Sequence, residues 1–169
     1  MLGGAILGLA LLLLVVAVVL RQRAGLPWGR VAAVDVGVGR PLERPLVAAR
    51  YGLVGKPDYL LERGGAMIPV EVKPGRRAPH PYDSDLMQLA AYCLLVEETT
   101  GHAPPCGYLR YANATFRLSY TPAVRWRLVA LLAEMRALLD ADDVARSHDD
   151  PRRCAGCGFR TLCDDALVE

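Results

Sequence analysis

Apolar and charged positions separate an N-terminal run from the rest of the chain. No charged side chain occurs from Met1 to Leu20, and Arg21 and Arg23 follow immediately. A helix of about 20 residues rises about 30 Å, which is the thickness of a hydrocarbon core. We therefore predict a single-pass transmembrane anchor at residues 1–21. Because the arginines follow the apolar run, the positive-inside tendency predicts that the rest of the chain lies on the cytoplasmic side of the cell membrane.

A juxtamembrane linker at 22–30 is expected to lead into one domain at 31–169. In this domain, patterns typical of strands alternate with apolar residues at helical spacing. The predicted strands are Val31–Val38 (a strand or an extended lead-in), Arg50–Leu61, Ala66–Lys73, Gly107–Tyr111 and Thr115–Tyr120, and the predicted helices run from about Asp83 to Glu98 and from Pro122 to Leu139. The pattern therefore predicts alternating strands and helices in this domain.

Local signals sharpen several boundaries of these elements. Asp83 or Ser84 can cap the first helix, and Thr121 followed by a proline suits the start of the second. Pro57 and Pro69 fall inside predicted strands, where a missing N–H favours a bulge or an edge position.

The hairpin predicted around Gly64-Gly65 brings charged residues together. With a two-residue loop, Asp58 pairs with Glu71 and Lys56 pairs with Lys73, so both carboxylates share one face. Opposed Cβ atoms lie about 4.5–5.5 Å apart, and two like charges at that distance favour a cation between them. Mg²⁺ accepts such oxygen ligands, and the Lys73 ammonium could point at a bound water or at a phosphate. The alternative is a solvated hairpin whose charges neutralise one another.

Gln88 and Tyr92 stand one helical turn apart and therefore share a helix face. With the apolar stripe of the helix turned to the sheet, both side chains could meet the hairpin or a DNA strand. The alternative is an ordinary amphipathic helix with a tyrosine at its boundary.

Charge alone does not indicate a nucleic-acid partner, because the formal net charge is only +2. Lys56 and Lys73 are the two lysines among twenty basic residues, and both lie in the hairpin, where they suggest a need for a compact ammonium. Arg76 and Arg77 follow directly. Lys56, Arg76 and Arg77 are candidate DNA contacts. The alternatives are a chance placement of surface lysines and, for the arginines, plain surface charge.

Five cysteines occur in the sequence, and Cys154, Cys157 and Cys163 fall within ten residues. An odd count with this clustering favours metal ligation in a reducing compartment over a disulfide framework. His148 could complete a tetrahedral zinc site with the three thiolates, or the thiols could pack without metal. Cys93 lies on the apolar stripe of a predicted helix and is expected in the core.

The segments GKPD, PVEVK, DLMQLAAYCLLVEE, GYLRY and CAGCGFRTLC occur in that order between Tyr51 and Cys163. Together they resemble the RecB-like branch of the PD-(D/E)XK nuclease superfamily, and most closely the CRISPR-associated RecB-like exonuclease family. This resemblance implies an α/β fold with a restriction-endonuclease-like mixed sheet flanked by helices. It also implies a Mg²⁺- or Mn²⁺-dependent deoxyribonuclease that acts on DNA ends or single strands.

The resemblance also implies roles for individual residues. The metal ligands would be Asp58, Glu71 and the Val72 carbonyl, Lys73 would assist the attacking water, and Gln88 and Tyr92 would line the site. In the family, the cysteine trio and a fourth, upstream cysteine hold a 4Fe–4S cluster. Cys106 or another side chain would have to supply the fourth ligand here.

Two departures from the family pattern lead to two hypotheses. Relatives carry a metal-binding histidine before the aspartate, whereas the first histidine here is His80, and no cysteine precedes Cys93. The first hypothesis is a membrane-anchored, metal-dependent DNA nuclease, an exonuclease by family, in DNA processing, repair or CRISPR-type defence. The second is a catalytically impaired DNA-binding or scaffold protein that retains the nuclease fold and binds DNA without turnover.

Overall fold

The computed structural model of the chain describes residues 8–9, 11–13, 15–16, 30–34, 42 and 44–167. Most of the predicted anchor and linker, residues 1–30, lies outside these ranges, and the described part of the anchor is helical. Within the same ranges, no helix combines the length and the apolar composition needed to cross a bilayer. The chain divides into two compact units, one ending at Ala130 and the other beginning at Leu131.

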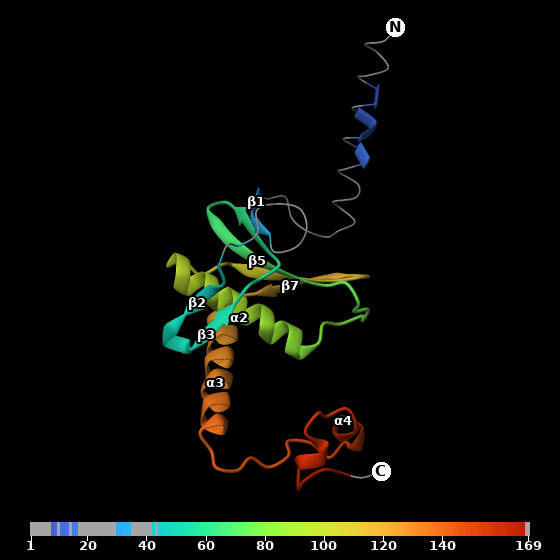
Figure 1. Ribbon diagram of the computed structural model, residues 1–169. Helices are drawn as coiled ribbons and strands as arrows, with labels where there is room; N and C mark the ends of the chain where they lie inside the picture. Colours follow the sequence, from blue (N-terminus) through green and yellow to red (C-terminus); the bar gives the residue numbers. More distant parts are fainter. Residues whose placement is uncertain are drawn as a thin grey trace. The chain divides into compact units, whose positions relative to one another are not determined.

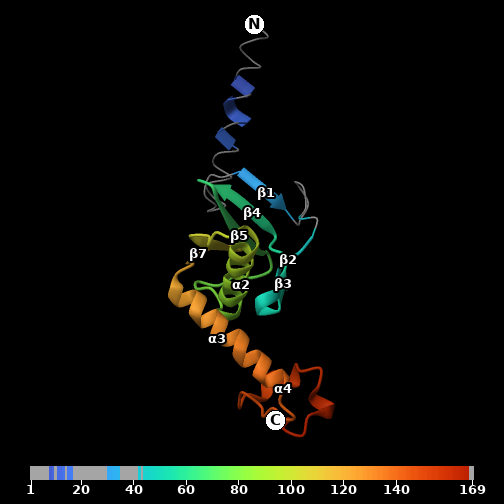
Figure 2. The same cartoon turned by 90° about the vertical axis from the view of Figure 1, so that its left-hand side faces the viewer.

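A five-stranded mixed sheet forms the centre of the first unit, as the α/β prediction requires (Figures 1 and 2). The strand order is β1-β4-β5-β6-β7, and β5 and β6 are parallel while the other neighbours are antiparallel. The strands are β1 (Arg30–Val34), β4 (Tyr59–Arg63), β5 (Ala66–Lys73), β6 (Cys106–Tyr111) and β7 (Thr115–Ser119). A separate antiparallel pair joins β2 (Leu46–Ala48) to β3 (Leu53–Gly55).

The β4–β5 hairpin has the predicted register only as far as the pair Tyr59–Val70, so the predicted ladder pairs of Asp58 with Glu71 and of Lys56 with Lys73 do not form. Arg63 pairs with Ala66, and the ladder continues to Tyr59 and Val70. Gly64 and Gly65 form the two-residue turn and have φ of +58° and +77°, a backbone conformation that residues with a Cβ rarely adopt.

The prediction of one strand over Arg50–Leu61 is wrong. This segment contains the end of a short 3₁₀ turn, η1 (Ala49–Tyr51), followed by β3 and β4 as separate strands. The break between β3 and β4 contains Pro57, which is buried and has no N–H to give to a ladder. The chain therefore leaves one strand pair and enters the other at this point.

The edge position considered for Pro69 is also wrong, because β5 lies between β4 and β6. Pro69 pairs with Leu60 in the antiparallel ladder, and the parallel pairing with β6 begins only at Val70. The missing N–H therefore falls before the β5–β6 ladder, which explains how a central strand accommodates a proline.

Helix α2 (Asp83–Thr100) makes the crossover that the parallel β5–β6 pair needs. Neither Asp83 nor Ser84 caps it: Tyr82 is the N-cap residue and makes no side-chain capping bond. Asp83 instead lies in the first turn, where a negative charge interacts favourably with the helix dipole. Gly101 is the C-cap residue that ends the helix, with φ of +75°.

Helix α3 (Pro122–Leu139) confirms the second predicted helix. The Thr121 hydroxyl accepts a hydrogen bond of 3.3 Å from the N–H of Val124, as an N-cap residue does. The second unit contains α4 (Pro151–Ala155), which Asp150 caps by accepting from the N–H of Arg152, and the 3₁₀ turn η2 (Arg160–Leu162).

The core of the first unit forms where α2 packs between the sheet and the β2–β3 pair (Figure 1). Leu89 of α2 is fully buried against Leu109 and Tyr111 of β6. On the opposite face of the sheet, Val70 is buried in a cluster with Cys106 and neighbouring apolar side chains. Burial on both faces fixes which side chains of β5 turn toward α2.

Candidate active site of the first unit

Asp58 lies immediately before β4, one step beyond the last ladder pair, Tyr59 with Val70. Its Oδ2 atom accepts a hydrogen bond of 2.7 Å from the N–H of Val72 on β5. The carboxylate therefore holds the end of β5 where the regular hairpin ladder has stopped. Asp58 and Glu71 are the next residues of the two chains after that last pair, beyond the regular ladder.

Glu71 is buried, with 6% of its surface exposed, and its Oε1 atom lies 2.7 Å from Nζ of Lys73. Burial raises the pKa of Glu71 above its ordinary value of 4.5, and the negative charge of Asp58 adds to this effect, although Lys73 opposes it. The two carboxyl groups are therefore close enough to repel each other. Both acids therefore lie at the same end of the hairpin, although Asp58 stands outside the ladder in which the two were predicted to pair.

Lys73 remains a cation in this environment. Partial burial acts to lower the pKa of its ammonium, but the hydrogen bond and the charge of Glu71 outweigh that effect, and Asp85 and Tyr92 add to it, so the pKa is raised. A lysine held in this way can bind a phosphate oxygen or orient a water, but it is a poor proton acceptor near neutral pH.

Gln88 and Tyr92 meet the same region from α2. The Gln88 Nε2 group donates to the Tyr92 hydroxyl at 3.0 Å. Burial raises the pKa of Tyr92, and the charges of Glu71 and Asp58 raise it further against the effect of Gln88, so the phenol stays protonated. The structure thus brings together all five predicted catalytic residues.

Close approach of the β2–β3 pair to α2 depends on Gly55, the first residue of the GKPD segment. A Cβ added there would lie 2.9 Å from Cδ1 of Leu95 and 3.0 Å from Cε1 of Tyr92, both closer than a normal contact. The glycine therefore lets the Tyr92 ring pack directly against the chain that leads to Asp58.

The predicted DNA contacts differ in their surroundings. Arg76 is partly exposed, at 42% of its side chain, yet its Nη1 atom lies 3.2 Å from Oδ2 of Asp85. Its guanidinium also stacks over the Tyr82 ring, 4.9 Å from the centroid. Arg77 is exposed, and Lys56 is partly buried.

Sequence reasoning missed a buried polar network beside these residues. Asp85 is 3% exposed and accepts a hydrogen bond of 2.6 Å from the Tyr111 hydroxyl, which in turn accepts the N–H of Tyr82 at 3.0 Å. Tyr111 pairs with Lys73 across β5 and β6, so the network adjoins the acids. The signal in the sequence is the three-residue spacing of Asp85 and Gln88, which places them on one helix face.

Two carboxylates and one ammonium gather where β5 ends and β4 begins, next to a cavity of about 110 Å³ lined by Asp58, Tyr59, Val72 and Pro74. Over the described residues, no three His, Cys, Asp or Glu side chains are grouped so as to hold a metal ion. The oxygen donors nevertheless suit Mg²⁺, which is commonly bound through one or two carboxylates together with water and substrate phosphate.

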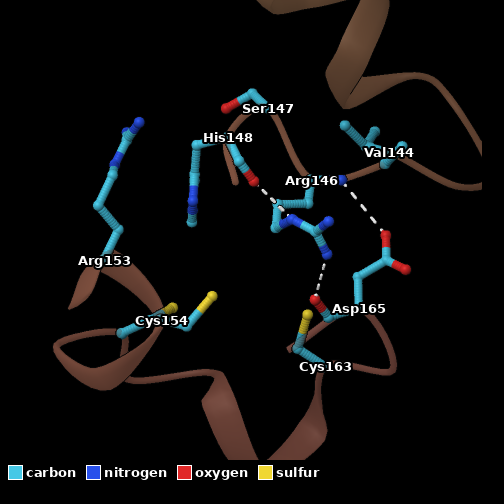
Figure 3. A pocket seen from close by; sticks show the side chains of 10 residues that line it. Val144, Arg146, Ser147, His148, Arg153, Cys154, Cys163 and Asp165 are labelled. Carbon is cyan, nitrogen blue, oxygen red and sulfur yellow. Dashed lines mark hydrogen bonds between the residues drawn. The ribbon is translucent and has the colours of Figure 1, made fainter. Parts of the chain in front are cut away.

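The cysteines separate into two groups, and all five thiols are free. Cys93 and Cys106 are buried in the first unit, as expected for Cys93. The trio Cys154, Cys157 and Cys163 lines one cavity of about 440 Å³ in the second unit (Figure 3).

A mixed sheet with a carboxylate pair, a lysine and a Gln–Tyr helix face at one end defines a protein of the nuclease class. The chain belongs to the PD-(D/E)XK nuclease superfamily, whose family model matches residues 9–164. The resemblance deduced from the motifs is thereby confirmed.

Curated relatives place the chain near CRISPR-associated nucleases. It is 33% identical over 132 residues to the CRISPR-associated exonuclease Cas4/endonuclease Cas1 fusion of Myxococcus xanthus, which covers 74% of this chain and 23% of the relative. It is 29% identical over 134 residues to the CRISPR-associated exonuclease Cas4 of Aeropyrum pernix, and the match covers 74% of this chain and 66% of the relative. It is 26% identical over 119 residues to the CRISPR-associated exonuclease Cas4 of Francisella tularensis subsp. novicida, and the match covers 69% of this chain and 58% of the relative. The chain thus spans less than two thirds of the length of each of these relatives.

Proposed function

We propose that the protein is a Mg²⁺- or Mn²⁺-dependent deoxyribonuclease that hydrolyses phosphodiester bonds at DNA ends or in single strands. The observation that carries the proposal is the convergence of Asp58 and Glu71 beside the ammonium of Lys73. Two acids that repel each other in a partly buried site are stabilised when a divalent cation binds between them.

Each residue of the site has a separate role in the proposed reaction. Asp58, Glu71 and the Val72 carbonyl would hold the metal, which when bound polarises the scissile phosphate and makes a bound water more acidic. Lys73 binds a phosphate oxygen or orients the attacking water, since its raised pKa keeps it charged. The proton of that water passes to solvent or to a phosphate oxygen, because Lys73 is already protonated.

Gln88 and Tyr92 orient the substrate from the helix side. Their mutual hydrogen bond fixes both side chains, and the protonated Tyr92 hydroxyl can donate to a phosphate oxygen near the acids. Lys56, Arg76 and Arg77 would contact the DNA backbone. Arg76 does so from a fixed position, because Asp85 and the Tyr82 ring hold its guanidinium.

A role in DNA processing of the CRISPR type is supported by the curated relatives, which are named CRISPR-associated exonucleases. Repair and other defence pathways use the same reaction on DNA ends. A preference for DNA ends over internal sites is therefore part of the proposal, and the DNA labelled at one end in the cleavage assay tests it.

Cleavage is tested on the full chain with single-stranded and duplex DNA labelled at one end, in Mg²⁺ and in Mn²⁺. We expect end-directed products that disappear in Glu71→Gln and persist in Glu98→Gln, an exposed carboxylate on the same helix as Gln88. No cleavage by the native protein, or equal cleavage by Glu71→Gln, would defeat the proposal. Salt-sensitive DNA binding without cleavage would instead support the scaffold hypothesis.

We also propose that residues 1–21 tether the chain to the cell membrane with the nuclease domain in the cytoplasm. This proposal rests on the uncharged run and the arginines that follow it. Fractionation of cells that express the full chain tests it. Recovery in the membrane pellet after a high-salt wash supports the tether, and recovery in the supernatant contradicts it.

The cofactor expected from the family for the cysteine trio fits less well. A 4Fe–4S cluster is held by four thiolates, and the cavity of the second unit presents three. The other two cysteines of the sequence, Cys93 and Cys106, are 0% and 2% exposed in the first unit. The residues present therefore do not match a four-thiolate cluster.

A further inference from the structure

We infer that Cys154, Cys157, Cys163 and His148 form a zinc site in the second unit. All four side chains line the same cavity of about 440 Å³. Three thiolates and one imidazole are a donor set that tetrahedral structural Zn²⁺ accepts, whereas the four-thiolate set of an iron–sulfur cluster is not available in this cavity. The inference is independent of any cleavage reaction in the first unit.

His148 is oriented toward the thiols. In Figure 3 its ring points into the cavity on the side that carries Cys154. The Nδ1 atom accepts a hydrogen bond of 3.3 Å from the N–H of Asp150, which is longer than the usual range for such bonds. A metal–imidazole bond would replace an interaction of little strength.

Arg146 fixes the segment that carries His148. Its Nε donates to the His148 carbonyl at 2.5 Å, and its Nη1 donates to the Asp165 carbonyl at 2.6 Å. A third bond, of 3.0 Å, joins Nη2 to the Asp149 carboxylate. The guanidinium therefore ties the histidine segment to the chain just after Cys163 (Figure 3).

The charge of Arg146 also suits the site. Three thiolates with one Zn²⁺ carry a net negative charge, and Arg146 and Arg153 both line the cavity. Both guanidinium groups would offset this negative charge. Outer partners of this kind orient and tune metal ligands.

Binding requires local closure, because the described residues contain no group of three His, Cys, Asp or Glu placed to hold an ion. Cys157 and Cys163 are exposed, and the regular structure between His148 and Cys163 amounts to α4 and η2. Such a segment can close around a cation at little cost in packing. Zinc should accordingly stabilise the second unit, since binding free energy becomes folding free energy.

The test is metal analysis of the full chain purified anaerobically, together with its visible spectrum before and after replacement of the metal by Co²⁺. We expect about one Zn²⁺ per chain, no iron, and a tetrahedral thiolate spectrum with Co²⁺. His148→Ala should lower the Zn²⁺ affinity by about 100-fold or more, since even the loss of an outer partner costs about 10–100-fold. His102→Ala, an exposed histidine of the first unit, should leave the affinity unchanged.

Three outcomes would overturn the inference: iron with the broad visible absorption of a cluster, no bound metal of either kind, or a Zn²⁺ affinity that His148→Ala leaves intact. Because His148 lies in a polar segment, its variant is checked for folding by circular dichroism. Cys157→Ser, at an exposed position, serves as a second variant and must also lose zinc.

Discussion

Replacing Gly107 by alanine tests how tightly β6 and α2 pack. A Cβ at Gly107 would lie 2.8 Å from both Cγ and Cδ1 of Leu89 and 3.2 Å from Sγ of Cys93. Ordinary carbon contacts begin at about 3.5 Å, so the new methyl overlaps Leu89 by about 0.7 Å. Leu89 is fully buried and cannot turn away.

The expected cost follows from two opposing effects. Overpacking of a well-filled core costs about 1–3 kcal/mol. The lower backbone entropy of the unfolded alanine variant returns about 0.5–1 kcal/mol. Gly107→Ala should therefore lower the free energy of unfolding by about 1–2 kcal/mol.

Urea unfolding followed by circular dichroism measures this free energy. Gly75→Ala is the matched control, because a Cβ there meets nothing within 4 Å, and it should be neutral or slightly stabilising. In the double variant with Leu89→Ala, the new methyl fills part of the space left by leucine. The two changes should then couple by about 0.5 kcal/mol or more. Strict additivity, or a Gly107→Ala protein as stable as the native one, would refute the reasoning.

Three further predictions concern the polar groups of the first unit. Asp58→Asn and Asp58→Ala should both abolish cleavage in the DNA assay. Only the alanine variant leaves the Val72 N–H without its acceptor. In urea unfolding, Asp58→Ala should therefore be about 1–3 kcal/mol less stable than Asp58→Asn. The raised pKa of Glu71, caused by burial and by Asp58, means that the folded protein holds this proton more tightly than the unfolded chain. Without metal, the free energy of unfolding in urea should therefore fall as the pH rises above 4.5 through the pKa of Glu71 in the folded protein, and Asp58→Asn should reduce that fall. A free energy of unfolding that rises with pH through this window, relative to Glu71→Gln, would contradict the raised pKa of Glu71. Tyr111→Phe removes the donor to buried Asp85 and should cost about 1–3 kcal/mol in the same unfolding assay, whereas a neutral effect would show that the bond is dispensable.

The sequence predicted the hairpin and its acids because short-range rules apply there. A Gly-Gly loop sets the register, and counting outward from it brings Asp58 and Glu71 to the same end of the hairpin, although the regular ladder stops one step earlier, at Tyr59 and Val70. The break before Asp58 was harder to predict. Pro57 signals an irregularity, but whether the chain bulges or changes partner strand depends on the β2–β3 pair, which has no strong signal of its own.

Asp85 could not be predicted as a buried residue for a related reason. A carboxylate in the first turn of a helix is most simply read as a solvated charge that favours the helix dipole. Its burial depends on Tyr111, 26 residues later, and on Arg76 in the preceding loop. Partners this far apart meet only once the parallel β5–β6 pair has formed.

Irregular backbone, rather than regular strand, is what creates the acidic site. If the hairpin ladder continued past Tyr59, the N–H of Val72 would serve a backbone carbonyl. Because the chain breaks at Pro57, the Asp58 side chain takes that N–H instead and is held beside Glu71 at the end of the sheet. The acids are thus placed by a missing stretch of ladder, and a metal bound between them would relieve the repulsion that this placement creates. A substitution that restored regular pairing at Pro57 should then stabilise the sheet while moving Asp58 away from Glu71, so that gain in stability and loss of metal binding would occur together.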